Sequence, residues 1–226
     1  MPEIFIGTSG WSYAWNPEKS LDWYVLNSGF NAIELNMSYY RFPYANMVKS
    51  WSKKGESLAW VIKVHRSITH YGKLYKKTYN TFRKFIDTFN PLKDYIHYYL
   101  LQLPPKFKDL DTVQTFVDEF NDVKLAIEFR NSSMFNDEVK AWGKENEVLL
   151  VSVDAPGLPR TIMSESIIYE RIHGRTEWYS HVYSDDELKE IKEIISIGNP
   201  ERVYVFFNND HGMLENGRNM LRLLNK

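Results

Sequence analysis

Charged and amide side chains recur along this chain at the ends of short apolar runs, and five times they occur two positions apart. Residues two apart on a β-strand share a face, so each pair would present both side chains to the same side. Carboxylate, ammonium, guanidinium and imidazole groups together supply acid–base catalysis and anion binding. The pairs are Glu34/Asn36, Lys63/His65, Glu128/Arg130, Arg171/His173 and Asn208/Asp210.

The first hypothesis is a metal-independent enzyme that performs acid–base chemistry on a small anionic substrate, with a hydrolase or a lyase favoured. The expected catalytic residues are Glu128, Lys63, His173 and Asp154. A carboxylate among them acts as general base or acid if burial raises its pKa. Arginine forks suit a phosphate or carboxylate, and aromatic rings suit the walls of a sugar site. The expected substrate-binding residues are Glu34, Asn36, His65, Arg66, Gln102, Arg130, Arg171, Asn208, Asp210, Trp11 and Tyr40.

Two other functions fit the same residues. A divalent-metal phosphodiesterase or nuclease would take its ligands from Glu128, Asp154, His173 and Asp210, whose oxygen and nitrogen atoms suit such ions. No closely spaced ligand motif supports it, and neighbouring arginines would compete for the carboxylates, so the first hypothesis assigns no metal and no other cofactor. A non-catalytic binding protein is the third reading. A strongly shifted pKa distinguishes a catalytic site from a binding site.

These residues need a scaffold that gathers the ends of many strands. Short apolar, β-rich runs alternate with longer amphipathic segments, which is typical of βα units and a parallel sheet. Their nearly continuous apolar character indicates strands covered on both faces. The predicted strands are Ile4–Gly7, Ala32–Leu35, Ala59–Val64, Tyr98–Leu103, Leu125–Phe129, Val148–Val153, Ile167–Ile172 and Val203–Phe207.

The pattern predicts an α/β fold of one domain over residues 1–226, a compact (β/α)₈ TIM barrel. In such a barrel the carboxyl ends of all strands meet on one rim, where barrel enzymes place their chemistry. The rival is an open doubly wound sheet, which needs a glycine-rich phosphate loop after its first strand. The segment from Gly7 to Gly10 lacks the third glycine of that loop, and bulky Trp11 follows it.

Bulk composition limits the partners and the setting of the protein. The formal net charge is −1, from 28 basic and 29 acidic residues, so the chain has no overall attraction for nucleic acid. The absence of cysteine excludes disulfides, thiolate metal sites and a cysteine nucleophile, and it fits a cytoplasmic protein. No long apolar run predicts a membrane span. We therefore expect a small-molecule partner, and the oligomeric state stays open.

Seven segments in order carry a family resemblance. They are Gly7–Tyr13, Glu34–Pro43, Lys63–His70, Gln102–Phe107, Ala126–Asn131, Arg171–Gly174 and Phe207–Asp210. Together they resemble the YecE-like family, the domain of unknown function 72, whose members are TIM-barrel proteins. The chain departs from the family pattern after Arg130, where Asn131-Ser132-Ser133-Met134 replaces a common His-Pro-Ser-Trp. The resemblance implies the barrel fold and implies no particular reaction.

Overall fold

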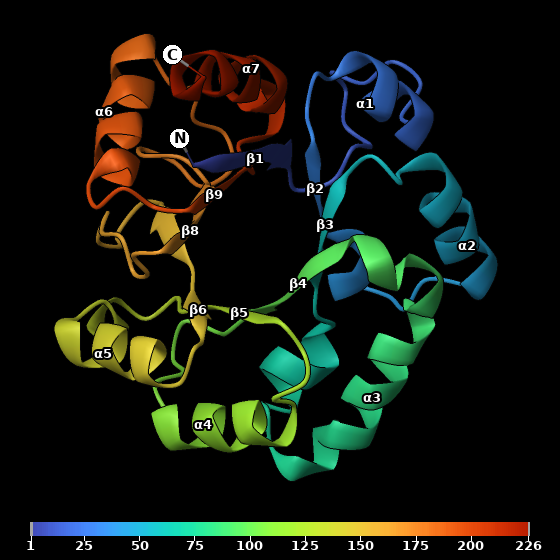
Figure 1. Cartoon of the computed structure of the whole chain (residues 1–226), viewed down its shortest axis with the longest axis vertical. Coiled ribbons are helices and arrows are strands. Elements are labelled where there is room, and N and C mark those ends of the chain that lie inside the picture. The colour runs from blue at the N-terminus through green and yellow to red at the C-terminus, as the bar shows by residue number, and fades with distance from the viewer. Residues whose placement is uncertain (1, 226) are drawn as a thin grey trace.

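A computed structural model of the chain describes residues 2–225 and confirms an α/β barrel with helices outside a ring of parallel strands (Figure 1). The strands are β1 (Glu3–Thr8), β2 (Ala32–Leu35), β3 (Ala59–Lys63), β4 (Ile96–Gln102), β5 (Leu125–Glu128), β6 (Leu149–Leu150), β7 (Ser152–Asp154), β8 (Ile167–Ile172) and β9 (Arg202–Phe207). The helices are α1 (Leu21–Asn27), α2 (Ala45–Lys54), α3 (Tyr79–Thr88), α4 (Leu110–Glu119), α5 (Asp137–Glu145), α6 (Asp185–Ser196) and α7 (Met213–Leu224).

Strands β6 and β7 are two parts of the single strand that the sequence predicts at Val148–Val153. The first part pairs with β5 and the second with β8, so the ladder changes sides at Val151. The backbone N–H of Val151 still donates to the carbonyl of Ile127, at 2.9 Å. This strand therefore joins the two hydrogen-bonded sheets, whose orders are β1-β9-β8-β7 and β2-β3-β4-β5-β6.

The other seam of the ring lies between β1 and β2, where side chains replace a backbone ladder. A Cβ on Gly7 would lie 2.1 Å from the carbonyl oxygen of Ala32, so only glycine allows this approach of the strands. The Tyr24 hydroxyl donates to that same carbonyl at 2.8 Å and accepts from the N–H of Thr8 at 3.2 Å. The Asn31 amide bonds two backbone groups of β1 at 2.8 and 2.9 Å.

Two apolar layers separate the inside of the ring from its outside. Small and aliphatic residues such as Ala59, Val61 and Leu100 alternate with the tyrosines Tyr169 and Tyr204 in the barrel interior. A second, larger cluster fills the space between strands and helices. Side chains on one strand point alternately into these two layers. The parity of a residue, meaning its odd or even position along its strand, therefore decides whether its side chain faces the interior or the helices.

The helices begin where local chemistry favours them. The capping box that begins α6 is formed by Ser184 and Glu187, each bonding the other's backbone N–H. Residues 155–166 between β7 and β8 form turns without a helix, and Pro156, Gly157 and Pro159 explain this because they interrupt helical hydrogen bonding. None of the helices in residues 2–225 combines the length and apolar character that crossing a bilayer requires.

The seam generates the first prediction. Tyr24→Phe leaves the Ala32 carbonyl and the Thr8 N–H without a partner in a buried place, which costs about 1–3 kcal/mol. Urea unfolding should show this loss. The matched control is Tyr44→Phe, because Tyr44 is 73% exposed and its change should leave the midpoint unaltered. Equal midpoints for the two variants would show that the seam does not depend on this hydroxyl.

Candidate active site at the barrel mouth

The last inward-facing layer of the barrel is polar, as the spacing of the strand-end residues predicts. Each member lies two residues after an apolar residue of the interior and therefore faces the same side of its strand. The ring closes these strand ends around one mouth. The members are Glu34 after Ala32, Lys63 after Val61, Gln102 after Leu100, Glu128 after Ala126, Arg171 after Tyr169 and Asn208 after Phe206.

Arg171 lies at the centre of this layer, fully buried, between two buried carboxylates. Its Nε and Nη2 atoms donate to the two oxygens of Glu34 at 2.8 and 2.5 Å, a bidentate pair. Its Nη1 atom donates to Glu128. Glu34 also accepts from the hydroxyls of Ser9 at 2.5 Å and Tyr169 at 2.6 Å. Glu34 thus accepts four hydrogen bonds, so its charge is fixed in place by the protein.

Arg130 extends the ion pairs toward the surface. Its Nε atom donates to the second oxygen of Glu128, and its guanidinium lies over the Trp178 ring, 4.6 Å from the ring centre. Burial alone would raise the pKa of Glu128, but the facing charges of Arg130, Arg171 and Lys63 outweigh burial and lower it. Glu128 is therefore a carboxylate at neutral pH and does not hold the proton that a general acid needs.

Lys63 is the cation of this layer that has no counter-ion. Its ammonium group forms no ion pair with any carboxylate of residues 2–225 and lies 4.5 Å from the centre of the Tyr39 ring. Burial and the charge of Arg171 lower its pKa to about 7, against the partial opposition of Glu34 and Glu128. Lys63 is therefore the group of the mouth that changes its charge near neutral pH.

His173 is buried and neutral at the same mouth. Burial and the charges of Arg130 and Arg171 hold its pKa well below the usual range of histidine. Nε2 accepts from Arg130 at 3.0 Å, and Nδ1 lies 3.2 Å from the side-chain amide of Asn208. Both ring nitrogens thus face protein groups. Its contacts orient Arg130, so its structural role is to fix the ion pairs.

Aromatic side chains and one arginine form the rim above this layer. The guanidinium of Arg66 lies 5.9 Å from the centre of the Tyr40 ring and 5.7 Å from that of Tyr71. Tyr40 and Tyr71 are exposed. Trp178, over Arg130, lies in the loop between β8 and α6. The rim therefore combines ring faces with positive charge, which suits an anion that carries a sugar or another flat group.

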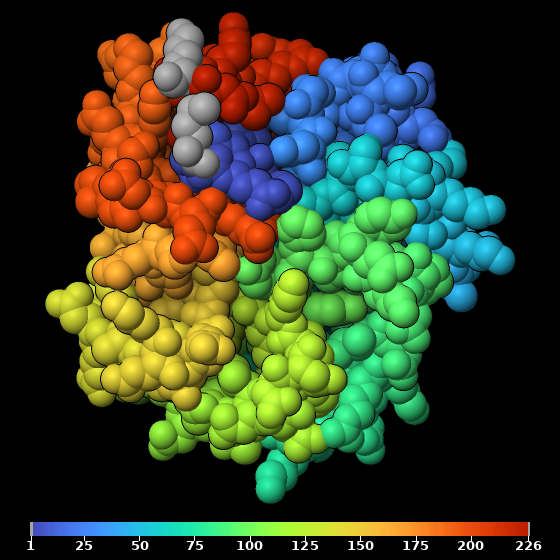
Figure 2. Space-filling view, viewed as in Figure 1, coloured from blue at the N-terminus to red at the C-terminus, as the bar shows by residue number. Residues whose placement is uncertain are grey.

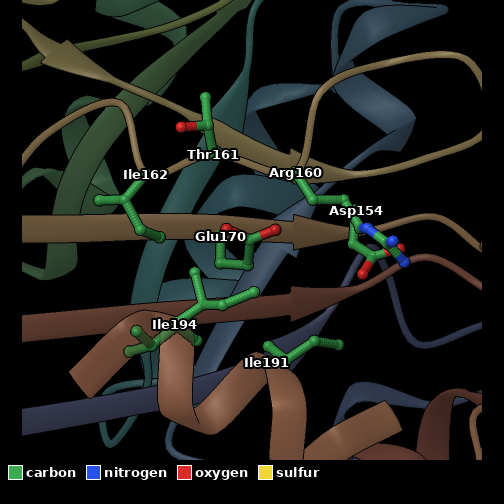
Figure 3. Close-up of a pocket in the computed structure, with 8 residues that line it drawn as sticks. Asp154, Arg160, Thr161, Ile162, Glu170, Ile191 and Ile194 are labelled. Atoms are coloured by element: carbon green, nitrogen blue, oxygen red, sulfur yellow. The ribbon is translucent and has the colours of Figure 1, made fainter. Parts of the chain in front are cut away.

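Asp154 lies on the other face of its strand, away from the mouth. Val153 faces the interior, and Asp154 lines a cavity of about 10 Å³ between β8 and α6, together with Glu170 and Arg160 (Figure 3). Its carboxylate accepts from the Tyr183 hydroxyl at 2.9 Å and from Arg175 at 3.1 Å. The strand parity, which the sequence carries, assigns Asp154 to the helix-facing layer, so a catalytic role at the mouth does not fit its position.

Four further predicted residues lie around the mouth or outside it. Trp11 packs against Trp51 and Trp60 in the layer between helices and sheet, so it is no wall of the mouth. His65 bonds the Ser67 hydroxyl at 2.8 Å and the carbonyl of the Tyr40 backbone at 3.3 Å, which holds it in the rim. Asn36 has a buried Oδ1 atom without a partner in residues 2–225. Asp210 is at the edge, beside His211 at 3.6 Å.

The alternative set of metal ligands is dispersed. Glu128 and His173 approach within 3.9 Å, but Asp154 faces the helices and Asp210 lies at the rim. Across residues 2–225, no group of three His, Asp or Glu side chains is arranged to hold a metal ion. The geometry gives the metal-dependent alternative no support.

The structure adds site residues that the sequence interpretation did not select. Tyr169 shares the inward parity of Arg171 and His173, so its spacing was a usable signal. Tyr39 ends a short 3₁₀ helix, Met37–Tyr39, and Trp178 lies in a turn, so neither follows a strand period that could have indicated it. His70 lies on a π-helical turn, Ser67–Tyr71, and its ring meets that of Tyr39 at 5.2 Å. Such turns often occur at functional sites.

His70 has the properties of a second proton-transfer group. Its Nδ1 atom bonds the Thr69 hydroxyl at 2.9 Å, while no group in residues 2–225 hydrogen-bonds to Nε2. Burial and the charges of Lys63 and Arg130 lower its pKa, against the opposing effect of Glu128. His70 is therefore neutral at pH 7 and has a free nitrogen beside the lysine.

Comparison with known proteins connects this arrangement with one family. A family model described as "Protein of unknown function DUF72" matches residues 5–226. A DUF72 family protein from Enterococcus faecalis V583 is 24% identical, with a TM-score of 0.85 over 99% of this chain and 96% of its own. One from Thermotoga maritima MSB8 is also 24% identical, with a TM-score of 0.82 over 99% of this chain and 100% of its own. No curated protein matched the chain.

More distant solved structures share the barrel architecture. A D-psicose 3-epimerase is 12% identical, with a TM-score of 0.54 over 99% of this chain and 98% of its own. The family 2 AP endonuclease from Brucella melitensis is 12% identical, with a TM-score of 0.53 over 96% of each chain. These likenesses confirm the TIM-barrel fold and carry no information on the reaction.

The central ion pairs generate the second prediction. Arg171→Met keeps most of the side-chain volume but leaves Glu34 and Glu128 buried without their shared counter-ion. We expect unfolding in urea to require about 3–5 kcal/mol less free energy. Arg83→Met is the control, since the Arg83–Glu119 pair lies at the surface and should cost less than about 1 kcal/mol. A loss no larger than that of the control would contradict the structural role of Arg171.

The buried lysine generates the third prediction. In the unfolded chain Lys63 keeps its proton up to about pH 10, whereas in the fold its pKa is about 7. The unfolded state thus holds more protons between these values, so the folded state gains stability as pH rises through this window. Lys63→Met removes the penalty and should stabilise the fold by about 2–3 kcal/mol more at pH 6 than at pH 9. Urea unfolding at both values measures this, with Lys108→Met as the exposed control. A gain that does not change with pH would refute a lowered pKa.

Proposed function

Since this chain belongs to the DUF72 family of TIM-barrel proteins, whose description assigns no activity, we propose its function from the barrel mouth: an enzyme that binds a small anionic substrate beside Lys63 and moves a proton with that lysine. The observation that carries the proposal is the buried ammonium group without a counter-ion. A binding site needs charge complementarity alone, whereas this mouth also contains a group whose pKa is matched to proton transfer at neutral pH.

The charge balance supports an anionic substrate. Arg171 and Arg130 neutralise Glu34 and Glu128, which leaves the charge of Lys63 uncompensated. A buried charge without a partner is costly, so a bound phosphate or carboxylate would relieve the penalty. Such a ligand also raises the pKa of Lys63, because an opposite charge favours the protonated form. Binding and proton uptake are therefore coupled.

The two candidate proton carriers have distinct environments. Lys63 takes up a proton when the anion binds, so in the complex its ammonium group acts as the general acid. His70 has a free Nε2 atom and accepts or returns a proton on the side of the mouth formed by the π-helical turn. Groups with separated pKa values are the pattern of acid–base catalysis. Arg130, held by Glu128 and Trp178, supplies positive charge for the negative charge that develops on the substrate.

The rim supports a substrate with a sugar or another ring. The exposed residues Tyr40 and Tyr71 both lie within 6 Å of the Arg66 guanidinium, at 5.9 and 5.7 Å, and the Arg130 guanidinium lies over the Trp178 ring. The reaction that this set of groups favours is an elimination next to a carboxylate. His70 removes the proton of the carbon that carries the carboxylate, the C–H electrons form a carbon–carbon double bond, and a hydroxyl or phosphate group on the neighbouring carbon leaves with the proton of Lys63. This is a lyase. A hydrolase is the alternative reaction class, in which the same base would activate a water molecule instead of removing a proton from the substrate.

The proposal predicts proton uptake on substrate binding. Sugar phosphates and sugar acids are titrated into the protein by calorimetry at pH 8 in buffers of different ionisation enthalpy. Because most Lys63 is neutral at this pH, a bound anion should bring up to about one proton with it. Lys63→Met should bind at least about tenfold more weakly and take up none, while Lys108→Met should behave as the wild type.

Turnover of the same compounds, followed by NMR, decides between an enzyme and a binding protein. Product formation that Lys63→Met abolishes is the expected result. Tight binding of one of these compounds without turnover would support an anion-binding site and contradict an enzymatic function. Proton uptake that persists in Lys63→Met would show that Lys63 is not the group that takes up the proton.

A further inference from the structure

A second cavity lies at the opposite end of the barrel from the mouth. It has a volume of about 230 Å³, and Glu3, His97, Tyr98, Lys124, Arg202 and Tyr204 line it. Glu3 and Arg202 are the first residues of β1 and β9 and are register partners, while Lys124 directly precedes β5. Figure 2 shows the molecule from the side where the dark-blue start of the chain meets the orange segment near residue 200.

Aromatic side chains give this cavity a fixed wall. Tyr204 stacks on Phe5 with ring centres 4.7 Å apart and meets the edge of Tyr98 at 5.5 Å. The Tyr204 hydroxyl and Nδ1 of His97 lie 2.8 Å apart. Because Tyr204 is buried and bonded on several sides, these rings hold their positions without a ligand. The cavity is therefore preformed, as small-molecule sites usually are.

The charges at the cavity are unbalanced. Arg202 donates to Glu3 at 2.8 Å, so these two charges cancel. Lys124 forms no ion pair with any residue among 2–225 and leaves a positive charge at the edge. His97 adds a second nitrogen, Nε2, to which no group of the described chain bonds. An anion would complete this set.

The Tyr98 hydroxyl is a free donor at this cavity. The side chain as a whole is 9% exposed, but the hydroxyl oxygen itself is accessible to solvent, and none of residues 2–225 hydrogen-bonds to it. Tyr98 lines the cavity, so a molecule inside it would accept this hydrogen bond.

We propose that this cavity binds a small oxyanion, a phosphate or carboxylate group, between Lys124, the Tyr98 hydroxyl and His97. Lys124 supplies the charge, and Tyr98 supplies a neutral donor from the barrel interior. Glu3 remains with Arg202 and so does not repel the anion. The site shares no residue with the mouth and does not depend on the function proposed for it.

The test uses inorganic phosphate and the Lys63→Met protein, in which anion binding at the mouth is already weakened. Calorimetric titration should detect phosphate binding in this background. Adding Lys124→Ala should weaken it at least about tenfold, and adding Tyr98→Phe should weaken it several-fold with the ring wall retained. Lys108→Ala is the matched control for loss of a surface lysine and should change nothing.

Thermal unfolding of each variant checks that the fold is retained, and the conservative Tyr98→Phe change keeps the test valid if Lys124→Ala disturbs β5. A crystal soaked in phosphate should hold the anion beside Lys124 and Tyr98. Phosphate affinity that is equal in all variants would overturn the proposal, and so would its absence at millimolar concentration. Neither result would bear on proton uptake at the mouth.

Discussion

One buried guanidinium holds the mouth of this barrel together. Arg171 bridges Glu34 on β2 and Glu128 on β5 across the ring from β8, so strands distant in the sequence are joined by charge. Isolated, each of these charges would be very costly to bury, and together they are stable because every oxygen of the two carboxylates accepts a hydrogen bond. The same arrangement lowers the pKa of Glu128, so this carboxyl holds no proton to give at neutral pH.

In the proposed function, this constraint leaves proton transfer to Lys63 and His70 at the edge of the ion pairs. Lys63 faces two carboxylates that are already neutralised and two arginines that repel it, so burial prevails and its pKa falls. His70 is near the same charges but owes its free nitrogen to the π-helical turn after β3. The proposed catalysis uses a rigid, charge-balanced centre with a titrating cation beside it, whose fixed dipoles need not reorganise during the reaction.

The barrel thus has polar groups at both ends and an apolar middle. Small residues such as Ala59 and Ala126 leave room for Tyr169 and Tyr204, which reach the polar groups at opposite ends through their hydroxyls. Closure on one side depends on Gly7 and Tyr24, because their contacts replace a ladder between β1 and β2. The strand that Gly7 and Tyr24 hold in place, β2, also carries Glu34, so the closure of the ring and the central ion pair involve the same strand.

The sequence by itself determined the strands, the barrel and the polar layer. Apolar runs and spacings of two residues are local properties of the chain, and the alternation along parallel strands places such residues on the same side at one rim of the barrel. It predicted Glu34, Lys63, Glu128 and Arg171 at the mouth for this reason. Only the tertiary structure decided the partners: which carboxylate meets which arginine, and that Lys63 has none, depends on the distance between strands far apart in the chain. Trp11 was misplaced because packing against helices depends on facing elements, and His70 was missed because its turn follows no regular period. Asp154 was misplaced although the alternation along its strand already assigns it to the helix-facing side.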